Sequence, residues 1–128
     1  MTKNDLPKYW LKGSDEALQV AEDLYRLNHR SFCLFFCHLT LEKAIKAVLA
    51  KKYPNQSFYV HSLTKLATSA ELDLPAEWLE ILDEVSTFNV KARYNDIKLE
   101  LYKRATSAYT KRFLTKTKGI QQWLKKQI

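Results

Sequence analysis

Residues 31–53 are the stretch that most restricts the fold, because they contain neither glycine nor proline and are apolar on nearly every side of a helix in their first half. Ser31 can cap the start of this helix, and Pro54 forbids its continuation. A helix without a polar face is either central in a bundle or shared with a second subunit. Other helices of the chain, or a second subunit, must therefore cover this helix on several sides.

Glycine and proline are scarce in the whole chain. The 128 residues include two glycines and three prolines, too few for the turns of an all-β fold, so a few long helices are predicted. The length suits a single domain, 1–128, and 46% hydrophobic residues can supply its core. We therefore predict an all-α domain with a lead-in at 1–13, an irregular connection at 92–104, and helices at 14–29, 31–53, 62–70, 75–90 and 106–128. Their predicted N-caps include Ser14, Ser31, Ser62 and Thr106.

The two cysteines, Cys33 and Cys37, lie one helical turn apart in a phenylalanine-rich run. One helix holds their backbones too rigidly for an easy disulfide, so we expect two small buried thiols. No metal site is expected, because His38 projects about 100° away from Cys37 on a helix. The chain shows no bilayer-spanning segment and no cleavable leader, which favours a cytoplasmic protein without membrane contact.

Positive charge is concentrated at the C-terminal end. The chain carries a net charge of +7; residues 1–96 hold 12 basic and 13 acidic side chains, whereas residues 97–128 hold nine basic residues and one acidic residue. Lys111, Lys118 and Lys125 are spaced by sevens and fall in one row on a helix. This basic surface is either a solvated face or a contact for RNA or an acidic partner.

Polar residues interrupt the apolar helix at regular intervals. His38, Glu42 and Lys46 follow one another at helical spacing on one side. They could line a ligand-binding cleft, or form a solvated stripe with a helical ion pair. Downstream, His61 is expected to hold the next helix through a backbone hydrogen bond. Burying these polar side chains without hydrogen-bond partners costs free energy, so their presence in an apolar helix needs an explanation.

These motifs, in their order along the chain, resemble the HEPN family of small helical domains, for which a nucleotide-binding role is suspected. The resemblance covers nearly the whole chain and depends on His38-x3-Glu42-Lys43-Ala44-x-Lys46-Ala47, His61-Ser62-Leu63 and Arg93-Tyr94-x-Asp96. It implies an antiparallel, up-down four-helix bundle with an additional short helix, commonly paired as a homodimer. It also implies a separately encoded nucleotidyltransferase as partner, in pairs that can act as toxin and antitoxin.

Arg93, Tyr94 and Asp96 are predicted to position a ligand, with His38, Glu42 and Lys46 as a second wall. A guanidinium can grip a phosphate and a tyrosine ring can stack on a base, although Arg93 could equally form a structural pair with Asp96 or Glu42.

The family's ribonucleases carry arginine, four to six intervening residues and histidine, a motif absent from this sequence. We therefore expect a non-catalytic nucleotide-, substrate- or partner-binding subunit without a cofactor. The alternatives are an atypical ribonuclease or toxin using His38 with Arg30 or Arg93, and a basic RNA-contacting adaptor.

Overall fold

The computed structural model describes residues 5–89 and 95–128, with residues 95–97 described by their backbone only. Within these ranges the chain forms six helices and no strand, which confirms the predicted all-α class. The helices are α1 (Asp5–Arg26), α2 (Arg30–Lys52), α3 (Leu63–Ser69), α4 (Ala76–Ser86), α5 (Asn95–Arg104) and α6 (Ser107–Lys125). None of them combines the length and apolarity needed to cross a membrane.

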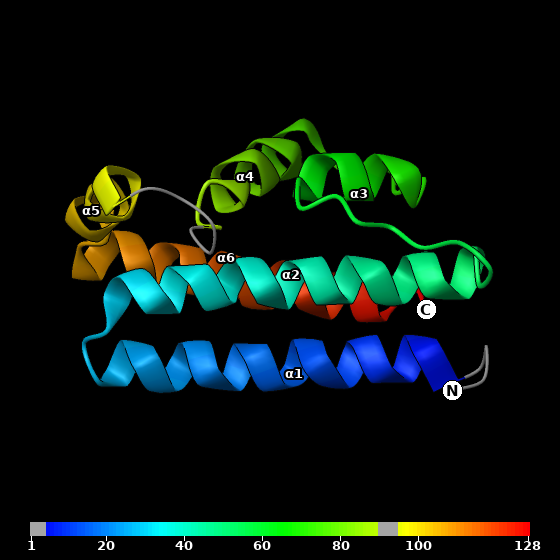
Figure 1. The fold of residues 1–128 in the computed structure, drawn as a ribbon, viewed down its shortest axis with the longest axis horizontal. Helices are drawn as coiled ribbons and strands as arrows, with labels where there is room; N and C mark the ends of the chain where they lie inside the picture. Colours follow the sequence, from blue (N-terminus) through cyan, green and yellow to red (C-terminus); the bar gives the residue numbers. More distant parts are fainter. Residues whose placement is uncertain (1–4, 90–94) are drawn as a thin grey trace.

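Helix α2 lies at the centre of the molecule. It runs antiparallel to α1, and α6 lies alongside both, while α3 and α4 cover the opposite side of α2 (Figure 1). Helix α5 lies at the end of the molecule where α6 begins (Figure 1). Because α2 contacts α1, α3, α4, α5 and α6, its lack of a polar face is explained by a central position.

The main core forms between α2 and helices α3, α4, α5 and α6. It contains apolar side chains from every helix except α1, with Leu34, Leu41, Leu49, Leu66, Leu82 and Phe88 among the fully buried ones. A smaller cluster joins α1 to α2 and includes Cys33 and Cys37, which are free and buried as predicted. A hydrogen bond with Cys33 and burial raise the pKa of the Cys37 thiol, so it stays protonated.

Helix α1 begins well before the predicted residue. The expected lead-in at 1–13 is wrong from Asp5 onward, because Pro7 falls in the first helical turn, where a backbone N–H has no intrahelical partner to lose. Ser14 is therefore an interior residue and not a cap. Its buried hydroxyl donates to the Thr40 carbonyl at 2.7 Å and accepts from Gln121 Nε2 at 3.1 Å, which links α1 to α2 and α6.

The predicted irregular connection at 92–104 is also wrong over residues 95–104, which form α5. This segment lacks glycine and proline, and its Leu101 enters the core. Helix α4 ends at Ser86, earlier than predicted, so that Phe88 can turn into the core. The predicted caps Ser62 and Thr106 are confirmed, since each accepts a backbone N–H three residues on, whereas Ser31 lies inside α2 after His29.

Candidate functional site

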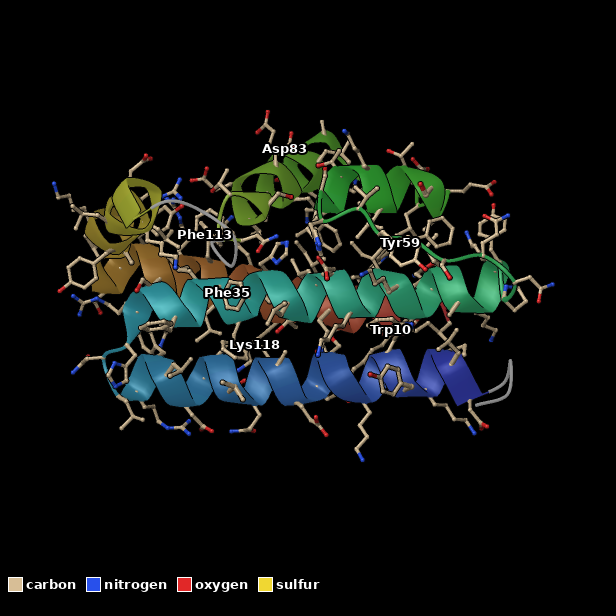
Figure 2. All side chains as sticks on the ribbon, in the orientation of Figure 1. Trp10, Phe35, Tyr59, Asp83, Phe113 and Lys118 are labelled. Carbon is tan, nitrogen blue, oxygen red and sulfur yellow. The ribbon has the colours of Figure 1, made fainter. Side chains whose placement is uncertain are left out.

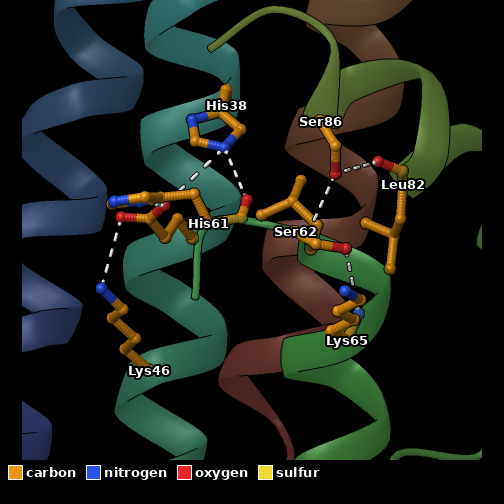
Figure 3. A network of polar contacts seen from close by, with 9 residues as sticks. His38, Lys46, His61, Ser62, Lys65, Leu82 and Ser86 are labelled. Atoms are coloured by element: carbon orange, nitrogen blue, oxygen red, sulfur yellow. Dashed lines mark hydrogen bonds and ion pairs between the residues drawn. The ribbon is translucent and has the colours of Figure 1, made fainter. Parts of the chain in front are cut away.

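Of the three polar residues on one side of α2, His38 and Glu42 are buried and Lys46 is partly buried. His38 is 0% and Glu42 6% exposed, and the Lys46 side chain is 13% exposed. Spacing of four residues stacks the three side chains along one side of the helix. The connection from α2 to α3 passes over them and brings His61 onto the same cluster (Figure 3).

Glu42 is the hub of this cluster. Its Oε1 accepts a hydrogen bond from His61 Nδ1 at 2.8 Å, and its Oε2 lies 3.4 Å from Lys46 Nζ (Figure 3). The Glu42 carboxylate thus contacts one residue of its own helix, Lys46, and one residue of the α2–α3 connection, His61. Two partners offset the cost of burying its charge.

The start of α3 fixes the position of His61. Ser62 Oγ caps α3 by accepting from Lys65 N, and the Leu63 backbone N–H donates to Ser86 Oγ at 3.0 Å (Figure 3). Ser86 Oγ in turn donates to the Leu82 carbonyl at 2.8 Å. The connection is therefore tied to α4 on one side of His61 and to α2 by His61 itself.

His38 is held as a neutral imidazole. Its Nε2 lies 3.1 Å from the His61 backbone oxygen, which can only accept, so Nε2 carries the proton. Its Nδ1 is buried and has no hydrogen-bond partner among the described residues. Burial lowers the pKa of His38, outweighing the His61 carbonyl and the Glu42 carboxylate, which act in the opposite direction. His61 thus bonds α2 twice, through its ring to Glu42 and through its backbone oxygen to His38, whereas the predicted hydrogen bond was to hold the next helix, α3.

The lowered pKa of His38 predicts that acid destabilises the fold. The unfolded chain binds a proton at His38 near the ordinary value of 6.5, whereas the folded chain does so only at lower pH. Stability is therefore full above pH 6.5 and is lost as the pH falls below it. Urea unfolding at about pH 7.5 and about pH 5.5 should show this loss, and His38→Gln should lose less on acidification. An equal loss in both proteins would contradict a buried neutral His38.

A cavity of about 290 Å³ lies beside this network. It is lined by residues of α1, α2 and the α2–α3 connection: Leu6, Trp10, Lys46, Ala50, Gln56, Ser57, Phe58 and Tyr59. Lys46 Nζ lies 5.2 Å from the centre of the Trp10 ring, within cation–π range. Trp10 and Tyr59 lie on the same face of the molecule (Figure 2), and Tyr59 is 84% exposed.

The ammonium of Lys46 therefore stands between a carboxylate and an indole at the wall of an aromatic cavity. The cavity brings together residues far apart in sequence, so the sequence analysis missed it. Tyr9 and Trp10 fall within the lead-in predicted at 1–13, and no local pattern predicts that Tyr59 lies close to Trp10.

The other predicted ligand residues are placed only in part. Arg93 and Tyr94 lie outside the described residues, and Asp96 is described by its backbone alone, in the first turn of α5. The role predicted for these three residues stays a prediction.

The row of lysines on α6 faces α1. Lys118 Nζ lies 3.2 Å from Glu22, and Lys125 Nζ lies 2.6 Å from Asp15. Lys111 Nζ lies 5.7 Å from the centre of the Tyr25 ring. Acidic and aromatic groups of α1 thus already contact the basic surface that the sequence predicted, although Lys118 remains about half exposed.

In the described part of the chain, six helices and a polar network between α2 and the α2–α3 connection define a small all-α domain. Residues 7–127 match the HEPN domain, so the chain belongs to the HEPN family. Its fold is similar to the crystal structure of TT1696 from Thermus thermophilus, with a TM-score of 0.81 and 17% identity over 97% of this chain and 99% of that one. It is also similar to ST0689, an archaeal HEPN homologue, with a TM-score of 0.73 and 18% identity over 94% of this chain and 96% of that one. No curated protein matches the chain.

Proposed function

We propose that this HEPN domain is a non-catalytic binding subunit that takes a nucleotide in the cavity beside Trp10 and Lys46. The observation that carries the proposal is the position of the Lys46 ammonium at the rim of an aromatic cavity. Aromatic walls favour a planar ring, and a partly buried ammonium favours a phosphate. A nucleotide carries both groups in one small molecule.

The size and polarity of the cavity support the same ligand class. Its volume of about 290 Å³ is at the small end of ligand pockets, which run from about 300 to 1,000 Å³. Phe58, Tyr59 and Trp10 supply apolar surface, while Gln56 and Ser57 supply hydrogen-bonding groups for a ring edge. A single nucleotide fits these dimensions better than a large cofactor.

The geometry favours binding over catalysis by the alternative ribonuclease pair. His38 is fully buried, and its Nε2 proton is engaged by the His61 carbonyl, so it cannot reach a substrate without opening the connection. Arg30 lies about two turns away along α2, and its Nε donates to the Ala105 carbonyl at 2.8 Å. His38 and Arg30 are therefore not arranged as a general base and a neighbouring cation.

The partners in this proposal come from the family resemblance. They are a second copy of the chain and a separate nucleotidyltransferase, in a pair of the toxin–antitoxin type. Phe32 is 61% exposed on α2 and is an apolar side chain that a second chain could cover. Sedimentation of the purified protein tests the dimer.

Removing the charge of Lys46 should weaken nucleotide binding. Lys46→Met keeps the apolar stem but loses the phosphate contact, so AMP should bind about 10- to 100-fold more weakly by isothermal titration calorimetry, as expected for a hydrogen bond to a charged group. Arg93→Ala in the same assay tests whether the Arg93–Asp96 group contributes.

Lys65→Met is the matched control, because Lys65 is an exposed lysine on α3 away from the cavity. It should bind AMP like the unmodified protein. Failure of the unmodified protein to bind any nucleotide, or equal affinity in Lys46→Met, would remove this cavity as the site. If Arg93→Ala lowers the melting temperature sharply, Arg93 is a structural residue.

A further inference from the structure

A second cavity, of about 220 Å³, shares Trp10 with the first. It is lined by Tyr9, Trp10, Lys12, Gly13, Glu16 and Lys43, from α1 and α2. Trp10 belongs to the walls of both cavities, and Tyr9 contacts it edge-on with ring centres 5.3 Å apart. The two cavities are therefore neighbours along the same groove between α1 and α2.

Each cavity has its own lysine from α2. Lys43 precedes Lys46 by three residues, so their Cβ atoms lie about 5–6 Å apart on the helix surface. Whereas Lys46 is paired with Glu42, Lys43 makes no hydrogen bond or ion pair with another described residue. The same holds for Lys12, so two unpaired cations face this cavity with one carboxylate, Glu16.

Gly13 makes room for Lys43. A Cβ atom at position 13 would lie 3.2 Å from Lys43 Cδ, closer than most such contacts, and 3.4 Å from its Nζ, so the Lys43 side chain would have to shift by a few tenths of an ångström. Glycine in the middle of a helix is unfavourable relative to alanine, and at position 13 the close approach of Lys43 is a local reason for it. Gly119 in α6 has no atom within 4 Å of such a Cβ and differs in this respect.

We propose that the two cavities form one site, in which Lys43 and Lys12 bind a second phosphate of the nucleotide held beside Lys46. The inference rests on the proposed function and extends it to a ligand class: nucleotides with a phosphate beyond the first. Such a phosphate can belong to a nucleoside triphosphate or to the next unit of a dinucleotide. Lys43 suits the second position because an ammonium forms strong charge-assisted hydrogen bonds to phosphate, and Lys43 has no ion pair with a described residue to give up.

The test compares three probes by isothermal titration calorimetry: AMP, ATP and the dinucleotide pApA. ATP, pApA or both should bind at least tenfold more tightly than AMP, and the probe that gains more identifies the source of the second phosphate. Lys43→Met should reduce this gain while leaving the AMP affinity unchanged. Gly13→Ala should also reduce it, since it displaces Lys43 without changing any charge, and Gly119→Ala is its matched control.

The outcomes separate the two proposals. If no probe binds, the proposed function fails. If AMP binds and neither ATP nor pApA binds more tightly, the single site stands and the second phosphate position is refuted. A gain that persists in the double variant Lys12→Met, Lys43→Met also refutes it. Circular dichroism of each variant is the control that tests whether the helices are retained.

Discussion

Glu42→Ala should lower the free energy of unfolding by about 2–4 kcal/mol, because it breaks a buried ionic network by removing its hub. The substitution leaves Lys46 without its carboxylate and removes the acceptor of His61 Nδ1. It also opens a cavity between α2 and the α2–α3 connection. Urea unfolding at about pH 7.5, compared with the unmodified protein, measures the loss.

Glu42→Gln is the control of matched shape. It keeps an oxygen for His61 but loses the negative charge that faces Lys46, so its loss should be smaller than that of Glu42→Ala. A loss below about 0.5 kcal/mol for Glu42→Ala is the size seen at ordinary surface sites. That result would show that the carboxylate is not part of a stabilising network.

Phe88→Ala should cost about 3–5 kcal/mol, the range for removing a large aromatic side chain from a core. Phe88 is fully buried just beyond the end of α4, with its ring centre 5.4 Å from Phe113 and 6.1 Å from Tyr109. The Arg104 guanidinium lies 5.4 Å from the same ring, so α4, α5 and α6 all meet at Phe88. Thermal unfolding followed by circular dichroism measures the effect.

Phe32→Ala provides the comparison, because Phe32 is the same residue type on the exposed side of α2. It should change the stability of the isolated chain by no more than about 0.5 kcal/mol. A similar loss of stability in both variants would mean that the buried Phe88 contributes no more to the core than the exposed Phe32. The melting temperature can also be measured at several protein concentrations. If Phe32→Ala changes this concentration dependence and Phe88→Ala does not, Phe32 lies in an interface between chains.

The fold could be predicted wherever the signals are local. Pro54 ends α2 within two residues, and the hydroxyls of Ser62 and Thr106 cap their helices. Predictions failed where a distant contact decides the conformation. Ser14 resembles a cap by its neighbours in sequence, but its partners are Thr40 and Gln121 on two other helices.

The candidate site likewise has features that local sequence signals predict and features that depend on distant contacts. The clustering of His38, Glu42 and Lys46 follows from a spacing of four residues on one helix, and it is found as predicted. Their burial does not follow, because it depends on a connection that folds back over α2 and presents His61. The aromatic cavity also needs two segments that are separate in sequence.

The arrangement of the three tryptophans gives the protein two independent optical probes. Trp78 and Trp123 contact each other edge-on, 5.6 Å between ring centres, where α4 meets α6. Trp10 contacts the ring of Tyr9, and Lys46 lies over the Trp10 ring. Emission from the first pair therefore reports the separation of α4 from α6, whereas quenching at Trp10 reports movement of an ammonium 5.2 Å away. If a nucleotide binds in the cavity as proposed, Trp10 can report its binding and the pair Trp78–Trp123 can report unfolding, without an added fluorophore.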